Sequence, residues 1–535
     1  MDGSASLGRI REYVDRHRER LATPGLALAV TDRDRCLGVV ADGVADVAAG
    51  TQLEPHHRFQ IGSISKGFTA LAVLQEVERG RMRLAAPVTE YLPWFEVRSS
   101  FGPITLHHLL SHTGGLVTGS DFTGSAVSEV WSLRDTETGF APGERFLYSN
   151  VGYKAVGLCL ESVTGEPWWR TVRAQAMEPI GMGGADVIIS EEARPRLATG
   201  HRSPTPDRRW LPRHGWGSSP WFESDTADGT ICATAEELTA YARLLLASGA
   251  GVVSPASFEA MTTPVLPDDL GQGYGYGLRR VRGDGRSLLG HSGGMVGFST
   301  QLLVDPSSGF GATTLTNSVY GATFDPCVFA LRCLAAEAAG EVLPEIPEPP
   351  DPYRIDGAGA FAGRYADGTS EIEVVARDGG LTVEEGGRSG RLRGEDGVFV
   401  VDDPVLERFP IRFVLEGGVV VGAHWGPRWL RHERAADASE PDHPGEWTRY
   451  PGRYVTWNPW FPGFHVFLRR GELWLAVSGE ASDVEGERPM FPLPDGSFRV
   501  GEPWSPDRVR FDMVIDGLAH RAVFDGAPAY RSFVP

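Results

Sequence analysis

Ser63 and Lys66, in the stretch Ser63-Ile64-Ser65-Lys66, place a hydroxyl and an amine three residues apart. On a helix, side chains at this spacing share a face, so a helix beginning here would bring the two groups together. Its N-terminal N–H groups and dipole would favour the negative charge that develops when a serine attacks a carbonyl. A desolvated lysine can take the serine proton. The spacing predicts a serine nucleophile with a lysine partner; the alternative is a capped helix with a solvated lysine.

Lysine is almost absent elsewhere in the chain. Among 51 basic residues only Lys66 and Lys154 are lysines, and the rest are arginines. Arginine stays protonated at any working pH, whereas a desolvated lysine can lose its proton. A lysine retained beside a serine therefore indicates a role that arginine cannot take. For Lys154, which has no such neighbour, we expect a surface position without a function.

A second candidate segment is Tyr148-Ser149-Asn150. A tyrosine beside a cationic lysine can pass a proton to a leaving group. Asn150 can orient Lys66 and bind a substrate carbonyl. The alternative is an ordinary buried tyrosine followed by a helix-capping asparagine.

A third candidate is His291 in RSLLGHSGGMVGFSTQLLVD, where strand–turn–strand patterning surrounds glycines that admit a substrate backbone. The alternative is a hairpin turn with an incidental histidine. Residues 290–294 also fit G-x-S-x-G, which would make Ser292 the nucleophile. That motif requires a strand–turn–helix context and alternating β and α elements. We reject it because the following stretch is strand-like.

The ordered set S-x-x-K, Y-x-N and H-x-G resembles the serine β-lactamase and penicillin-binding-protein superfamily. Within it, the closer resemblance is to the branch of class C β-lactamases, DD-carboxypeptidases, D-aminopeptidases and esterases. HHLLSHTGGL (107–116), YSNVGYKAVGLCLE (148–161), DGTICATAEELTAYARLLL (228–246) and YGYGL (274–278) are similar to the connecting motifs of that branch. The resemblance covers about residues 1–340. It implies an α+β fold, a β-lactamase/transpeptidase-like catalytic domain with an antiparallel sheet flanked by helices.

The resemblance also implies roles for the first two motifs. Ser63 resembles the acylated nucleophile, and Lys66 resembles its base partner. Tyr148 is similar to the proton shuttle of acylation and deacylation. Asn150 is similar to the ligand of the substrate amide.

The third motif departs from the β-lactamases. His291 stands where they have a lysine, as it often does in the peptidase and esterase relatives, and Gly293 closes the motif. Histidine is a weaker carboxylate anchor at neutral pH, so we expect a peptidase or esterase rather than a β-lactamase. The implied oxyanion hole consists of the backbone N–H groups of Ser63 and Gly294. No metalloprotease, P-loop or dinucleotide motif occurs, so we expect no metal and no cofactor.

Hydrophobic periodicity predicts the elements that must position these residues. Residues 6–21 read as an amphipathic helix, followed by a hairpin of two short apolar strands. A helix is predicted from Ser63 to Gly80, strands over 274–316 and a helix at 325–340. Further helices are expected around 106–111, 151–162, 169–178 and 235–247. We assign residues 1–340 to one serine hydrolase domain of mixed α and β structure.

The hydrophobic pattern of the sequence changes after the proline-rich, acidic linker 341–354. Residues 355–433 and 448–535 show short alternating strands with glycine turns, separated by a second linker at 434–447. FAGRYADG (361–368) matches YPGRYVTW (450–457), which indicates one unit repeated. We predict two all-β antiparallel barrels or sandwiches, an arrangement that resembles the D-aminopeptidases.

Several aromatic residues and one histidine have two interpretations. The turn from Trp457 to Phe464 either caps the substrate cleft and limits substrate size or packs on its own barrel. Another aromatic group either lines an acyl pocket or covers the core: Trp210, Trp216, Trp221 and Phe222. His112, in an apolar turn, is predicted to be structural.

Composition limits the partners. The formal net charge of -19 repels phosphate backbones and anionic lipid, so we expect no nucleic-acid and no membrane partner. Five cysteines without C-x-x-C spacing suggest free thiols. The N-terminus carries charge where a signal peptide needs an apolar core, so we expect a cytoplasmic location.

We therefore expect a serine hydrolase that acts through a Ser63 acyl-enzyme on small peptides, amides or esters, with a possible D-residue preference. One alternative is a penicillin-binding-protein-type thioesterase or acyl transferase that passes the acyl group from a thioester on a carrier protein to an amine. An alternative of another class is a non-catalytic binding protein on a hydrolase scaffold.

Overall fold

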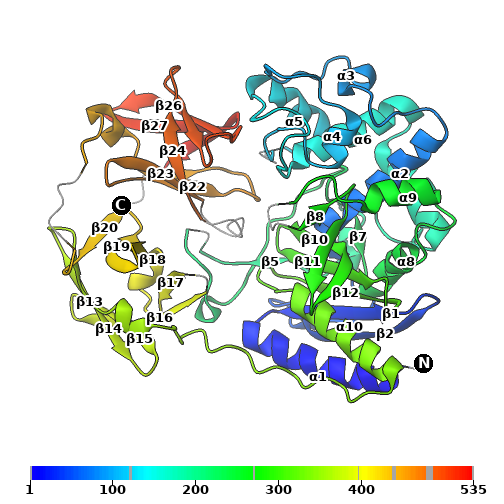
Figure 1. The fold of residues 1–535 in the computed structure, drawn as a ribbon, viewed down its shortest axis with the longest axis horizontal. Helices are drawn as coiled ribbons and strands as arrows, with labels where there is room; N and C mark the ends of the chain where they lie inside the picture. Colours follow the sequence, from blue (N-terminus) through cyan, green and yellow to red (C-terminus); the bar gives the residue numbers. More distant parts are fainter. Residues whose placement is uncertain are drawn as a thin grey trace.

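A computed structural model of the chain describes residues 3–119, 123–205, 207–268, 272–395, 397–435, 441–477 and 486–532. The N-terminal unit, up to Ala339, lies beside two β-barrels, with the first barrel at lower left in Figure 1 and the second above it. Five of the predicted linker residues, 436–440, lie outside the described residues. Among the described residues, no helix has the length and apolarity that a membrane crossing requires.

An antiparallel sheet forms the centre of the N-terminal unit, in the order β3-β2-β1-β12-β11-β10-β9-β8. The predicted hairpin is confirmed, because β1 pairs with β2. The strands are β1 (Gly25–Thr31), β2 (Cys36–Asp46), β3 (Thr51–Gln52), β8 (Gly273–Tyr274), β9 (Arg279–Gly283), β10 (Arg286–Met295), β11 (Phe298–Asp305) and β12 (Phe310–Thr316).

Helices cover both faces of this sheet. Alternate residues of β1 point to opposite sides, so Leu26 and Leu28 pack with α1 (Ser4–Leu21) and α10 (Phe324–Ala339). Ala27 and Ala29 belong to the core on the other face, to which α8 (Ala235–Leu246) contributes. Figure 1 shows α1 and α10 side by side below the sheet. The sequence predictions of these helices are confirmed.

A helical layer adjoins the sheet. Helix α2 (Ser65–Glu78) is buried over nearly its whole length, and the chain turns after it at Gly80, whose φ of +73° suits glycine. The other helices are α3 (Val88–Tyr91), α4 (Leu106–Leu110), α5 (Ala126–Ser132), α6 (Asn150–Thr164), α7 (Trp168–Val172) and α9 (Pro255–Thr262). Lys154 on α6 is only 3% exposed. The prediction that it is a surface residue is therefore wrong: its helix carries it into the core.

The C-terminal half forms two closed antiparallel barrels, β13–β20 and β21–β28. The repeat is visible in detail: Tyr365 and Tyr454 are both buried, and each hydroxyl donates to the carbonyl four residues earlier, of Phe361 and Tyr450. The first barrel comprises β13 (Gly363–Ala366), β14 (Glu371–Arg377), β15 (Gly380–Glu385), β16 (Arg388–Glu395), β17 (Val398–Val401), β18 (Ile411–Glu416), β19 (Val419–Trp425) and β20 (Arg428–His432). The second comprises β21 (Gly452–Val455), β22 (Gly463–Arg469), β23 (Glu472–Val477), β24 (Glu487–Pro492), β25 (Phe498–Val500), β26 (Arg508–Ile515), β27 (Leu518–Phe524) and β28 (Ala527–Arg531).

The first barrel is joined to the N-terminal unit by a buried carboxylate. The Glu407 side chain is 4% exposed and pairs with Arg208, Arg213 and His214. Removing these partners would leave the carboxylate buried without a counter-charge, so the ion pairs stabilise this contact.

The second barrel makes both charged and aromatic contacts with the N-terminal unit. Arg499 and Arg508 pair with Glu137. Trp460, in the aromatic turn between β21 and β22, packs against Phe222 with ring centroids 6.1 Å apart. This turn therefore contacts the N-terminal unit as well as its own barrel.

Candidate active site

Ser63 lies in a single 3₁₀ turn, Gly62–Ile64, directly before α2. The preceding strand β4 (Phe59–Gln60) pairs with β7 (Cys232–Ala233). On the other side, the Thr300 hydroxyl of β11 donates to the Ile61 carbonyl over 2.9 Å. The turn is thus held between β7 and the central sheet, and Ser63 itself is half-buried.

Lys66 lies one helical turn beyond Ser63 and is completely buried. Its Nζ donates to Ser63 Oγ at 2.9 Å, to Asn150 Oδ1 at 2.8 Å and to the Asp228 carbonyl at 2.7 Å. These three acceptors match the three N–H groups of an ammonium. The structure therefore brings together Ser63, Lys66 and Asn150, as the sequence predicted, and adds the backbone of Asp228.

The Tyr148–Asn150 segment approaches Lys66 from the helical layer. Ser149 caps α6, with its Oγ accepting from Gly152 N, so Asn150 begins the helix. Lys66 Nζ lies 5.0 Å from the centroid of the Tyr148 ring. In the described part of the chain, the buried Tyr148 hydroxyl has no hydrogen-bond partner. A substrate or leaving group can supply one.

His291 lies on β10, and both of its ring nitrogens are occupied. Nε2 is 3.0 Å from the Tyr274 hydroxyl, and Nδ1 is 2.5 Å from the Ser292 carbonyl. Burial, and then the nearby Arg279 guanidinium, lower the pKa of His291 to about 3, so the ring is neutral. The catalytic role that the sequence predicts for His291 stays a prediction. The structure shows a neutral, hydrogen-bonded ring beside Tyr148, with centroids 6.3 Å apart.

The glycines of the third motif allow β10 to approach the nucleophile turn. A Cβ on Gly62 would come within 2.7 Å of Gly294 N, and one on Gly293 within 2.0 Å of the Ile61 carbonyl. Only glycine permits this contact. The Gly294 backbone amide therefore lies beside the Ser63 turn. Its part in an oxyanion hole stays a prediction.

The strand–turn–strand context predicted around Ser292 is confirmed. Ser292 lies within β10 and pairs with Gln301 of β11, not at a strand–helix junction. The structural context of a G-x-S-x-G nucleophile is therefore absent at Ser292.

The aromatic residues between Trp210 and Phe222 fall into two groups. Trp210 and Trp216 stack on each other at 4.2 Å, and Trp216 Nε1 donates to the Ala22 carbonyl, so this pair covers the N-terminal unit. Trp221 and Phe222 pack on the core, next to Trp460 and just before Asp228.

Sequence reasoning missed two contributors. The Asp228 carbonyl was missed because a backbone acceptor leaves no side-chain signal. Tyr274 was quoted only as part of YGYGL, although its hydroxyl contacts both His291 and His112. The alternation of tyrosine and glycine at 274–277, before the H-x-G strand, was the available signal.

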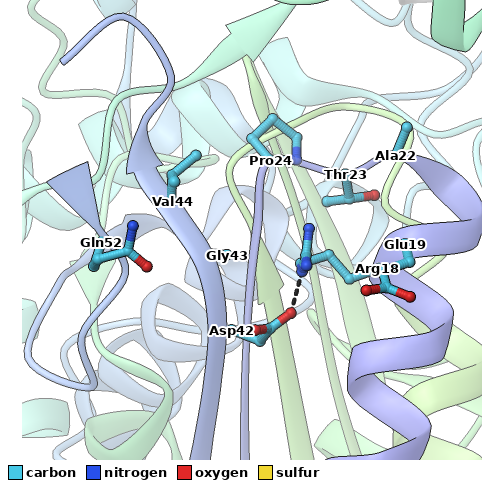
Figure 2. A pocket seen from close by; sticks show the side chains of 9 residues that line it. All are labelled: Arg18, Glu19, Ala22, Thr23, Pro24, Asp42, Gly43, Val44 and Gln52. Atoms are coloured by element: carbon cyan, nitrogen blue, oxygen red, sulfur yellow. Dashed lines mark hydrogen bonds and ion pairs between the residues drawn. The ribbon is translucent and has the colours of Figure 1, made fainter. Parts of the chain in front are cut away.

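A surface hollow of about 600 Å³ lies away from these residues, between the end of α1 and strands β2 and β3 (Figure 2). None of the predicted site residues lines it. Its lining comprises Arg18, Glu19, Ala22, Thr23, Pro24, Asp42, Gly43, Val44 and Gln52. Throughout the described ranges, no cluster of three His, Cys, Asp or Glu side chains is arranged to hold a metal ion. The described cysteines are free thiols.

Comparison with known proteins agrees with this arrangement. The family model described as Beta-lactamase matches residues 10–335. The chain is 31% identical to Penicillin-binding protein 4 of Amycolatopsis lactamdurans over 383 residues, 66% of this chain and 96% of that protein. It is also 31% identical to Esterase EstB of Burkholderia gladioli over 215 residues, 36% of this chain and 55% of that protein.

The fold is also shared with a solved structure, the octameric penicillin-binding protein homologue from Pyrococcus abyssi. The TM-score is 0.61 at 24% identity, and the match covers 80% of this chain and 98% of that chain.

Proposed function

The chain belongs to the beta-lactamase family of serine hydrolases, and we propose that it hydrolyses small peptides, amides or esters through an acyl-enzyme on Ser63. The observation that carries this proposal is the 2.9 Å contact between Lys66 Nζ and Ser63 Oγ, with the amine completely buried. Nucleophilic catalysis by serine requires such a partner within hydrogen-bond reach.

Acylation follows from the positions of these groups. With Lys66 in its unprotonated form, Ser63 Oγ attacks the substrate carbonyl carbon while the amine takes the serine proton and passes it on to Tyr148. The oxyanion accepts from the N–H groups of Ser63 and Gly294. The bond to the leaving group then breaks, Tyr148 returns the proton to that group, and an ester to Ser63 remains.

Deacylation repeats the sequence with water. A water molecule attacks the ester carbonyl while Tyr148 takes its proton, and the Ser63–carbonyl bond breaks. Ser63 recovers its proton and the acid is released. Asn150 holds Lys66 through Oδ1, and its amide N–H groups can donate to the substrate carbonyl.

The substrate class rests on two supports. Esterase EstB is named as an esterase, which supports ester cleavage by this chain. A catalytic unit followed by two barrels resembles the D-aminopeptidases, which supports a preference for a D-residue at the acyl position.

The test is a panel of matched D- and L-aminoacyl amides and p-nitrophenyl esters. We expect hydrolysis of the esters and of the D-aminoacyl amides, with larger kcat/KM for D than for L. Equal rates would contradict the stereochemical part of the proposal, and no turnover of any ester would contradict hydrolysis itself. Adding an amine separates hydrolysis from acyl transfer, because a transferase would convert the acyl-enzyme mainly to amide.

The aromatic turn of the second barrel is proposed to limit substrate size. Trp460 packs against Phe222, in the loop that leads to Asp228. Trp460→Ala is expected to raise the ratio of kcat/KM for a bulky acyl ester over an acetyl ester by about tenfold, because it removes this aromatic contact.

Trp457→Ala provides the matched control, since Trp457 is 98% exposed in the same turn. It should leave the ratio unchanged. An equal ratio of the two kcat/KM values in wild-type and Trp460→Ala protein would contradict the size-limiting role. The turn would then be a packing contact.

A further inference from the structure

His112, at the turn after α4, contacts the Tyr148 segment in three ways. Its carbonyl accepts from Leu147 N at 2.8 Å, and its Nδ1 accepts from Ser149 N at 3.1 Å. Its ring lies 4.1 Å from the Tyr148 ring, centroid to centroid. These contacts hold the backbone on both sides of Tyr148 and one face of its ring. None of them uses the Tyr148 hydroxyl.

The hydrogen bonds continue from His112 across the site. His112 Nε2 is 3.2 Å from the Tyr274 hydroxyl, which is 3.0 Å from His291 Nε2. His291 Nδ1 then reaches the Ser292 carbonyl at 2.5 Å. This series of hydrogen bonds therefore links the Tyr148 segment to β10, which carries the third motif.

The two ends of this series of hydrogen bonds determine which group donates in each bond. A backbone N–H always donates, so Ser149 makes His112 Nδ1 an acceptor. A carbonyl always accepts, so His291 Nδ1 must carry a proton to donate to Ser292. If both rings are neutral, His112 donates from Nε2 to the Tyr274 oxygen, and the Tyr274 hydroxyl donates to His291 Nε2. Every donor then meets an acceptor.

Neutral rings agree with their surroundings. Burial, and then the charge of Lys66, hold the pKa of His112 well below its usual value. Burial and Arg279 do the same for His291. His112 also has a φ of +57°, a conformation that costs free energy for a residue other than glycine.

We propose that His112 and Tyr274 are positioning residues for Tyr148, with the two histidines held as opposite neutral tautomers. The inference rests on the proposed role of Tyr148 as the proton shuttle. Since the Tyr148 hydroxyl has no partner among the described residues, its position depends on the contacts of its ring and backbone. The arrangement holds the tyrosine while leaving its hydroxyl open to the reacting proton.

The first test uses the wild-type protein and does not depend on activity. Long-range ¹H–¹⁵N spectra of ¹⁵N-histidine-labelled protein distinguish a proton on Nδ1 from one on Nε2. We expect His112 protonated on Nε2 and His291 on Nδ1, with assignments from the signals lost in His112→Asn and His291→Asn. The same tautomer for both, or a charged ring at neutral pH, would overturn the inference.

The second test removes the link. Tyr274→Phe keeps the ring and deletes the hydroxyl. We expect kcat for ester hydrolysis to fall by about tenfold to a hundredfold with little change in KM, because small misplacements of a catalytic group are costly. Both histidine tautomers should persist, because the Ser149 N–H and the Ser292 carbonyl still face the two Nδ1 atoms. The control is Tyr241→Phe, a 1% exposed tyrosine on α8 whose hydroxyl has no partner in the described residues; it should retain wild-type kcat.

The outcomes separate the two proposals. If Tyr148→Phe leaves ester hydrolysis unchanged, the proposed role of Tyr148 fails whatever the tautomers are. If Tyr148→Phe is inactive but Tyr274→Phe keeps wild-type kcat, the positioning role fails and the proposed function stands. Should Tyr274→Phe not fold, the wild-type tautomers still decide the inference.

Discussion

Ser63→Ala is expected to lower kcat for ester hydrolysis by about a millionfold, the size of effect seen when a serine nucleophile is removed. The hydroxyl is the only group of Ser63 that the Lys66 amine contacts in the described structure. Deleting it removes the nucleophile and leaves the turn before α2 intact. Steady-state rates with a p-nitrophenyl ester, together with the melting temperature, measure the effect.

Ser292→Ala is the matched control, because Ser292 belongs to the competing G-x-S-x-G pattern and lies within β10. It should keep activity within a few-fold of wild type. Activity that survived Ser63→Ala but disappeared in Ser292→Ala would transfer the nucleophile to β10 and contradict the proposed mechanism.

Lys66→Arg is expected to reduce kcat by about a thousandfold, within the range for loss of a general acid–base group. The amine meets three acceptors around one nitrogen, whereas a planar guanidinium presents its donors in a fork. The larger group must also fit a site with no exposed surface. The measurement is single-turnover acylation, followed by the release of p-nitrophenol.

The control is Lys154→Arg, at the chain's second lysine, which is also buried and lies on α6. We expect it to change the melting temperature more than the acylation rate. Acylation by Lys66→Arg at the wild-type rate would show that a permanently charged group suffices there, against the role proposed for the amine.

The local part of this architecture was predictable from sequence. Helix α1, the β1–β2 hairpin, helix α2 ending before Gly80, and the two all-β units follow from periodicity and turn residues, and the structure confirms them. The structure also decides between barrels and sandwiches, since both units are closed barrels. The Ser63–Lys66 contact was predictable for the same reason, since a single helical turn produces it.

Contacts between distant segments were not predictable in this way. The Asp228 carbonyl reaches Lys66 because β4 pairs with β7, a pairing that depends on the whole fold. The burial of Lys154 depends on what packs around α6, and the two occupied nitrogens of His291 depend on Tyr274 and the strand backbone. Residue identity alone carries no record of these neighbours.

The most direct test of the Ser63 acyl-enzyme is intact-mass spectrometry after incubation with a fluorophosphonate, on wild-type and Ser63→Ala protein. The mechanism predicts one adduct per wild-type chain, mapped to the peptide containing Ser63, and none on the variant. An adduct that persists in Ser63→Ala would contradict the assignment of the nucleophile. No adduct on wild-type protein that hydrolyses esters would contradict the activated serine itself.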